Sequence, residues 1–179
     1  MRSLIYAIAT GLAGAAVLHI LIILSVPHFT GRDAYTRITA YDEDNRFFLL
    51  DARKNAFGLS TDDPFLEEAV CSFSVEDRPV RLTAEGGVPF WSYAVYDSSS
   101  NEVFSMNDRS SVGGALDTIV ASPAQLNAIR KDNPDIVARS ILVEMPRPEG
   151  YVVLRALAPA PSFREAARDF LAGAACEPL

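Results

Sequence analysis

The segment PFWSYAVYDSSSNEVFSM, residues 89–106, decides the fold of this chain. Phe90–Tyr96 and Glu102–Met106 are apolar and aromatic runs of strand length, and the polar residues 97–101 between them are typical of a turn. The two runs therefore predict an antiparallel hairpin, the strongest such signal in the sequence. Because apolar side chains fall on both faces of the first run, we expect a central strand that is covered on both sides.

Weaker strand signals lie on both sides of this hairpin. Val70–Val75 alternates with a period of two residues, and Glu76–Arg78 is expected to turn the chain back into a partner strand, Pro79–Thr83. Four further strands or buried extended segments are expected at 47–50, 116–121, 140–145 and 151–157. The pattern predicts a mainly β (α+β) domain, an antiparallel sandwich or jelly-roll-like arrangement with a few short helices.

The short helices are expected at recognisable start signals. Ser122-Pro123 begins a helix over 124–131, and Ser162-x-x-Glu165 has the form of a capping box. The helix that starts at Ser162 ends at Gly173 and has an apolar face made of Phe163, Ala166, Ala167, Phe170 and Leu171. Asp62-Asp63-Pro64 predicts another helix over 65–69, residues 33–38 predict one more, and residues 54–60 predict a loop.

Near the N-terminus, Leu4 to Val26 is a run of 23 residues without Asp, Glu, Lys or Arg. As a helix the run is about 34 Å long, enough to cross a hydrocarbon core of about 30 Å. It is longer than the roughly 7–15 apolar residues of a signal peptide, and no Ala-x-Ala site follows it. We expect one transmembrane helix that contacts the bilayer through residues 4–26, rather than a cleaved signal or a buried core helix.

This anchor divides the chain into three parts. Residues 1–27 are the N-terminal transmembrane anchor, and residues 28–61 are a juxtamembrane linker with the segment that leads into the domain. Residues 62–179 are the β-rich globular domain. Arg2 precedes the span and two arginines, Arg32 and Arg37, follow it closely, so charge does not favour a cytoplasmic N-terminus.

Residues 89–97, followed by residues 102–109, resemble a hairpin of a bacterial group, the domain-of-unknown-function families 1254 and 1214. Their C-terminal domain has a similar Phe-Trp-Ser…Tyr-Asp hairpin followed by an Asn/Asp-Arg turn. The chain resembles more closely small single-pass relatives of that uncharacterised group. With them it shares the anchor, the segment Asp63-Pro64…Ala69-Val70-Cys71, the helix start at 122–126 and a C-terminal Cys. The resemblance covers most of the chain from Asp33 onward and implies a β-rich fold and an envelope location.

Cys71 and Cys176 are the only two cysteines. An even number of cysteines in an exported domain suggests a disulfide, and two buried free thiols are the alternative. A bridge from residue 71 to residue 176 closes a loop of 106 residues, for which the chain-entropy model gives at most about 4.7 kcal/mol. The cysteines and the family resemblance together favour a single-pass signal-anchor protein of the cell inner membrane, with its C-terminal domain in the periplasm.

Six residues in or beside the hairpin are candidates for ligand binding. They are Trp91, Tyr93, Asp97, Asn107, Asp108 and Arg109. If the two strands pair, Asp97 and the group 107–109 lie at opposite ends of the hairpin, which argues against one joint site. Aromatic residues at strand spacing are usually core, and an Asp-Arg pair is usually a turn, so structural roles remain open for all six.

Composition excludes several functional classes. The net charge is −7, with only two lysines and no cluster of basic residues, which argues against nucleic acid as a partner. The sequence has no Gly-x-Ser-x-Gly, no Gly-rich phosphate loop and no His-Glu-x-x-His. A Ser-His-Asp triad would have to use His28, and the position of His28 beside the membrane argues against such a triad. We expect no metal site and no cofactor, since no His in the domain accompanies the cysteines.

The sequence therefore predicts a membrane-anchored envelope protein with an extracytoplasmic β-rich binding or interaction domain. An envelope protein is the expected partner, and a non-enzymatic role is favoured. The alternative is a membrane-tethered hydrolase or lipid-handling enzyme that uses carboxylates. A deep pocket with two or more convergent carboxylates would favour this alternative.

Overall fold

The computed structural model of the chain describes residues 2–29, 34–40, 45–50, 63–111 and 113–179. It divides into two compact units, Met1–Asp33 and Ala34–Leu179. The first unit contains helix α1 (Arg2–Phe29). Its segment Arg2–Val26 is long and apolar enough to cross a membrane and has no part buried in the protein. This length and apolarity agree with the expected membrane-spanning helix, and a signal sequence has the same features. The absence of buried surface in the segment argues against a buried core helix.

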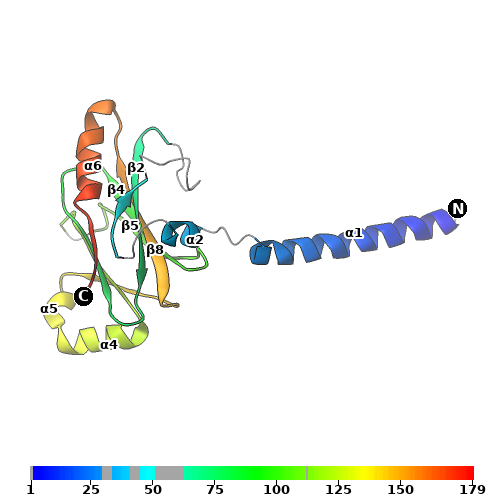
Figure 1. Ribbon diagram of the computed structural model, residues 1–179, viewed down its shortest axis with the longest axis horizontal. Coiled ribbons are helices and arrows are strands. Elements are labelled where there is room, and N and C mark those ends of the chain that lie inside the picture. Colours follow the sequence, from blue (N-terminus) through cyan, green and yellow to red (C-terminus); the bar gives the residue numbers. More distant parts are fainter. Residues whose placement is uncertain (1, 30–33, 41–44, 51–62, 112) are drawn as a thin grey trace. The chain divides into compact units, whose positions relative to one another are not determined.

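The second unit consists of two β-sheets that enclose one core (Figure 1). The five-stranded sheet has the order β1 (Phe48–Leu49), β2 (Leu66–Ser74), β8 (Glu149–Leu157), β4 (Trp91–Asp97), β5 (Glu102–Asn107), with antiparallel neighbours throughout. The four-stranded sheet has the order β7 (Ile141–Glu144), β6 (Leu116–Ala121), β3 (Val80–Ala84), β9 (Ala175–Pro178). Its β6–β7 pair is parallel. The mainly β, α+β fold class is confirmed.

The predicted hairpin forms as β4 and β5, and β4 lies between β5 and β8. Alternate residues of β4 point into the core between the sheets, where Trp91 and Val95 are fully buried. The indole nitrogen of Trp91 donates a hydrogen bond to the carbonyl of Gly114 at 3.0 Å. Its ring stacks on Phe170 at a centroid distance of 6.3 Å. Trp91 and Val95 are therefore core residues.

A disulfide joins Cys71 on β2 to Cys176 on β9. Because the two strands belong to different sheets, the bond links the sheets across the core. Both cysteines are fully buried. The predicted pairing is confirmed. Strand β9, which the sequence pattern did not predict, places Cys176 next to β2.

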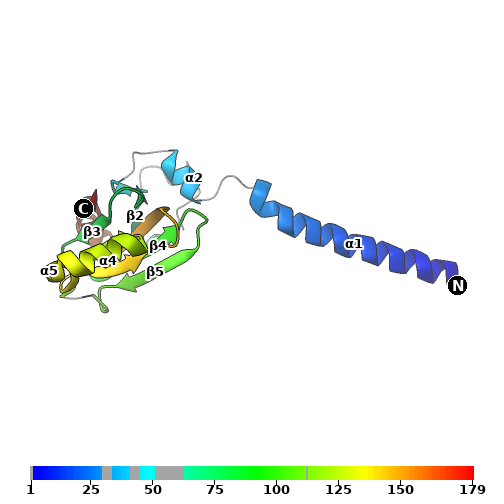
Figure 2. The same ribbon diagram turned by 90° about the horizontal axis from the view of Figure 1, so that it is seen from below.

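In the described part of the domain, four α-helices lie around the sheets. Helix α6 (Arg164–Ala172) contributes Phe170 and Leu171 to the core, and α2 (Ala34–Thr39) covers the opposite, outer face of the five-stranded sheet with Ile38 (Figure 1). Helices α4 (Pro123–Asp132) and α5 (Pro134–Val137) pack on the outer face of the four-stranded sheet (Figure 2). The helix start predicted at Ser122-Pro123 is confirmed, and Ser122 and Gln125 form a capping box there. Helix α2 and strand β1 thus contribute segments of the predicted linker to the globular unit, while residues 54–60 lie outside the described residues.

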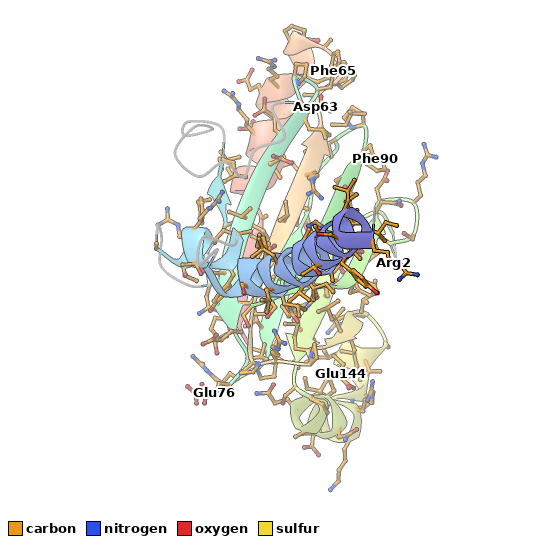
Figure 3. All side chains as sticks on the ribbon, turned by 90° about the vertical axis from the view of Figure 1, so that its right-hand side faces the viewer. Arg2, Asp63, Phe65, Glu76, Phe90 and Glu144 are labelled. Atoms are coloured by element: carbon orange, nitrogen blue, oxygen red, sulfur yellow. A yellow bond between two sulfur atoms is a disulfide. The ribbon has the colours of Figure 1, made fainter. Side chains whose placement is uncertain are left out.

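Two local predictions are wrong because sheet pairing dominates. The predicted helix over 65–69 is instead the start of β2, which pairs with β8 along its whole length. A five-residue helix is too short to be stable alone. Asp63 instead caps a turn, because its carboxylate accepts the backbone N–H of Phe65 at 2.9 Å. Figure 3 shows Asp63 and Phe65 at one end of the domain and Glu76 at the other. The predicted β2–β3 hairpin is also wrong, since after Glu76 the chain crosses to the second sheet.

The predicted capping box at Ser162 is wrong as well. A short 3-10 helix, η2 (Pro161–Phe163), precedes α6, so Ser162 lies inside a turn and no side chain caps α6. Phe163 and Ala166 are exposed rather than part of the apolar face. Ala167, Phe170 and Leu171 are buried as expected.

We predict that Trp91→Ala lowers the free energy of unfolding by about 3–5 kcal/mol, because the indole is fully buried and a cavity would remain. The matched control is Phe65→Ala, whose side chain is 54% exposed and whose loss should cost under about 1 kcal/mol. Urea unfolding of both variants measures the difference. Equal, small losses would mean that Trp91 does not anchor the core.

Candidate functional site

The two aromatic candidates from the sequence, Trp91 and Tyr93, are core residues with almost no exposed surface. The hydroxyl of Tyr93 is hydrogen-bonded to the hydroxyl of Thr118 on the facing sheet. Burial raises the pKa of Tyr93 to about 12, and the hydrogen bond from Thr118 only partly offsets this. The positions of both side chains support the core interpretation that the sequence left open.

Asp97 is buried at the turn between β4 and β5. Its carboxylate accepts hydrogen bonds from the backbone N–H groups of Ser99 and Asn101, each at 2.9 Å, and faces Arg147 at 3.6 Å. Burial acts to raise the pKa of Asp97, but the hydrogen bonds from Asn101 and Ser99 and the charge of Arg147 outweigh it. The pKa therefore lies below its usual range. These contacts give Asp97 the role of a turn cap.

The remaining three candidates lie at the opposite end of the hairpin. The side-chain oxygen of Asn107 accepts the backbone N–H of Arg109 at 3.0 Å, which closes a turn. Arg109 is exposed, and Asp108 donates its backbone N–H to Trp91 at 3.1 Å. One carboxylate oxygen of Asp108 is buried without a hydrogen-bond partner among the described residues. The hairpin therefore does not bring the six candidates together. Of these, Tyr93 and Asn107 line the outer cavity described below.

Four polar residues form a line across the outer face of the five-stranded sheet. Glu68 on β2 is in register with Arg155 on β8, Arg155 with Ser92 on β4, and Ser92 with Asn107 on β5. Residues in register on adjacent strands point to the same side of a sheet. This polar row faces away from the core, because the neighbouring positions Cys71, Val95 and Leu154 point inward.

The guanidinium of Arg155 forms a hydrogen bond through its Nε, whereas its two terminal nitrogens form none with the described residues. Its Nε donates to Glu68 Oε1 at 3.1 Å, and Glu68 is almost fully buried. Within the described part of the chain the two terminal nitrogens of Arg155 have no hydrogen-bond partner. The Arg155 side chain is 29% exposed. A fixed guanidinium with free terminal N–H groups is suited to bind a planar or tetrahedral anion.

A stacked pair of tyrosines stands further along the same face. Tyr96 and Tyr151 are in register, and their rings are 4.9 Å apart at an angle of 14°. Only Ala94 and Val153 lie between this tyrosine pair and the polar row on β4 and β8. Small residues between larger walls leave the surface hollow.

Two adjoining cavities occupy this hollow. The first, the outer concavity, has a volume of about 420 Å³ and is lined by polar side chains that include Ser92, Ser105 and Asn107. The second, the α2 cavity, has a volume of about 200 Å³ and is lined by Ile38, Val70, Val153 and other apolar residues. Tyr96 and Arg155 line both cavities.

A third cavity, of about 550 Å³, lies between β1, β9 and the end of α6, and its charged lining residues are Arg46 and Glu177. The outer face is the better candidate for a functional site, because four strands place polar groups there in one line. The hydroxyls of Ser92 and Tyr96 also have no protein partner among the described residues. Ligand sites commonly combine an apolar cavity with a few convergent polar groups.

Other charged groups are paired for structure. Arg81 binds both carboxylate oxygens of Asp117, at 3.0 and 2.8 Å, on the four-stranded sheet. Glu67 on β2 is nearly buried and faces Arg164 and Arg168 of α6. Among the described residues no group of His, Cys, Asp and Glu has a geometry that could hold a metal ion.

No protein-family model matches the sequence, and no curated protein matches it. Similar solved structures include the following two. The VPA0106 protein from Vibrio parahaemolyticus has a TM-score of 0.58 and 13% identity over 83% of this chain and 35% of that protein. An uncharacterized protein from Burkholderia cenocepacia has a TM-score of 0.50 and 16% identity over 73% of this chain and 36% of its own. This chain spans about a third of each, and at such identities the likeness concerns the fold alone.

We predict that Asp97→Asn reduces the acid sensitivity of the fold. Because the folded pKa of Asp97 lies below its unfolded value of about 3.9, the ionised group stabilises the fold above that pH. This contribution is lost as the pH falls through the folded pKa. The free energy of unfolding should therefore fall more for the wild type than for Asp97→Asn between about pH 7 and about pH 3. Asp132→Asn, an exposed position on α4, is the control, and equal pH dependence in all three proteins would contradict the turn-cap role.

Proposed function

We propose that the chain is a membrane-anchored envelope protein whose extracytoplasmic β-sandwich binds a ligand or partner through the outer concavity. The observation that supports binding concerns the guanidinium of Arg155 and the hydroxyls of Ser92 and Tyr96, which line one cavity. The two terminal nitrogens of Arg155 and both hydroxyls have no hydrogen-bond partner among the residues that the structure describes. The location is supported by an apolar segment of membrane-spanning length and by a buried disulfide, since disulfides persist in oxidising compartments. We assign the protein to the cell inner membrane with its domain in the periplasm.

Binding is favoured over hydrolysis by the placement of the carboxylates. The enzymatic alternative requires two or more convergent carboxylates in one deep pocket. Of the three cavities, the outer concavity has Glu102, the cavity between β1 and β9 has Glu177, and the α2 cavity has no carboxylate. A binding role therefore fits these cavities better than acid–base catalysis.

A relation to the domain-of-unknown-function families 1254 and 1214 is part of the proposal. The β-rich fold of the domain supports it, because that resemblance implies a β-rich fold. Superposition of an experimental structure of this protein on solved members of both families tests the relation. The same strand order in both sheets is expected, and a different order would refute it.

We predict that the full-length protein stays in the membrane fraction after high-salt and carbonate washes. The 25-residue segment Arg2–Val26 holds the membrane by its apolar side chains, which salt does not screen. Fractionation followed by an immunoblot measures this. Release of a full-length soluble species by salt would refute the anchor.

We predict that a photo-crosslinking amino acid at Ser105, in the outer concavity, gives adducts in intact cells. The matched control places the same amino acid at Asp132, an exposed position on α4, where no adduct is expected. Mass spectrometry of the purified protein detects the adducts. Equal labelling at the two positions, or none at Ser105, would count against the outer concavity as the binding face.

A further inference from the structure

The outer concavity and the α2 cavity differ in chemistry although they adjoin. The outer concavity is lined by hydroxyl and amide groups from β4 and β5, whereas the α2 cavity is lined mainly by aliphatic and aromatic side chains. Arg155 and Tyr96 stand at the boundary, because both side chains line both cavities. A molecule that fills both volumes must therefore have a polar part and an apolar part.

The positive charge of Arg155, which lines both cavities, favours a negative charge on the polar part of the ligand. Glu68 accepts the Nε–H of Arg155, and among the described residues the two terminal nitrogens have no hydrogen-bond partner, on a side chain that lines both cavities. Ser92 and Asn107, the register neighbours on β4 and β5, add polar groups on the same side. Glu102, the carboxylate in the outer concavity, lies in register with Tyr96, away from the polar row, and accepts the Ser105 hydroxyl at 2.7 Å. An anion therefore fits beside Arg155, at the end of the concavity opposite Glu102.

The α2 cavity limits the size of the apolar part. Its volume of about 200 Å³ is below the roughly 300–1,000 Å³ of pockets that hold whole small ligands, so it suits one short chain. Val70, Tyr151 and Val153 from the sheet and Ile38 from α2 form an apolar lining for that chain. Ala94 lines the outer concavity and its register partner Val153 lines the α2 cavity, so the path of the chain from one volume to the other runs over these two small side chains.

We propose that this face binds an anionic amphiphile, a carboxylate or phosphate joined to a short hydrocarbon chain. The anion forms a bidentate pair with Arg155 in the outer concavity, and the chain enters the α2 cavity beside the tyrosine pair. The proposal rests on the function proposed above and specifies its ligand class. A free fatty acid and a lipid phosphate share this chemistry.

The test uses the full-length protein in phosphatidylcholine nanodiscs and titration calorimetry, with empty nanodiscs subtracted. The probes are octanoate and octyl phosphate, compared with 1-octanol, which lacks the charge, and with inorganic phosphate, which lacks the chain. We expect at least one anionic amphiphile to bind about tenfold or more tightly than both incomplete probes. Preference for octanoate indicates a fatty acid, and preference for octyl phosphate indicates a lipid phosphate.

Variants locate the binding. Arg155→Lys retains a cation for Glu68 but loses the bidentate geometry, and it should weaken binding about tenfold. Ala94→Leu fills the passage and should weaken binding of the eight-carbon probes without affecting the fold in a thermal melt. Arg164→Lys is the control. Arg164 is the exposed ion-pair partner of Glu67, and this variant should bind the probes like the wild type.

The proposal is overturned if neither amphiphile binds above empty nanodiscs, or if Arg155→Lys binds as tightly as the wild type. These outcomes are separate from failure of the proposed function. If the protein is retained in membranes and crosslinks at Ser105 while both amphiphiles fail to bind, the binding domain stands and this ligand class is refuted.

Discussion

One covalent bond, between Cys71 on β2 and Cys176 on β9, joins the two sheets of the domain. Its two partners are 105 residues apart in sequence, so the bond encloses most of the globular unit. In the chain-entropy model a loop of this size contributes at most about 4.7 kcal/mol, comparable to the net stability of a small domain. Strand β9 pairs with β3 in its own sheet, and the disulfide also links β9 covalently to β2.

The inward position of Cys71 also determines what the other face of the sheet presents. Side chains alternate along a strand, so an inward Cys71 places Val70 and Glu68 on the outer face. A slip of one residue would exchange the two faces of β2 and separate Glu68 from Arg155. The same parity on β8, β4 and β5 aligns Arg155, Ser92 and Asn107. The polar row is thus a consequence of the core, although none of its members is a core residue.

Local patterns in the sequence predicted the elements better than their pairing. The hairpin of β4 and β5, strand β6 and the capped helix α4 each follow from signals within about ten residues, and each is present. The insertion of β8 between β2 and β4 depends on contacts far apart in sequence, which alternation does not specify. The predicted helix over 65–69 was wrong for this reason, since β8 recruits those residues into a strand. Of the residues that line the candidate site, the sequence predicted Tyr93 and Asn107. The remaining signal was a charged Arg155 inside the apolar run YVVLRAL, and its partner Glu68 is 87 residues away.

The disulfide is the structural feature that supports a domain outside the reducing cytoplasm. Thiol alkylation in intact cells, with and without reductant and followed by a mass-shift gel, tests this link most directly. Because Cys71 and Cys176 are the only cysteines, the assay has no other thiol to report. The account predicts no alkylated cysteine in the denatured protein before reduction and two after it. Two thiols free to react before reduction would contradict it.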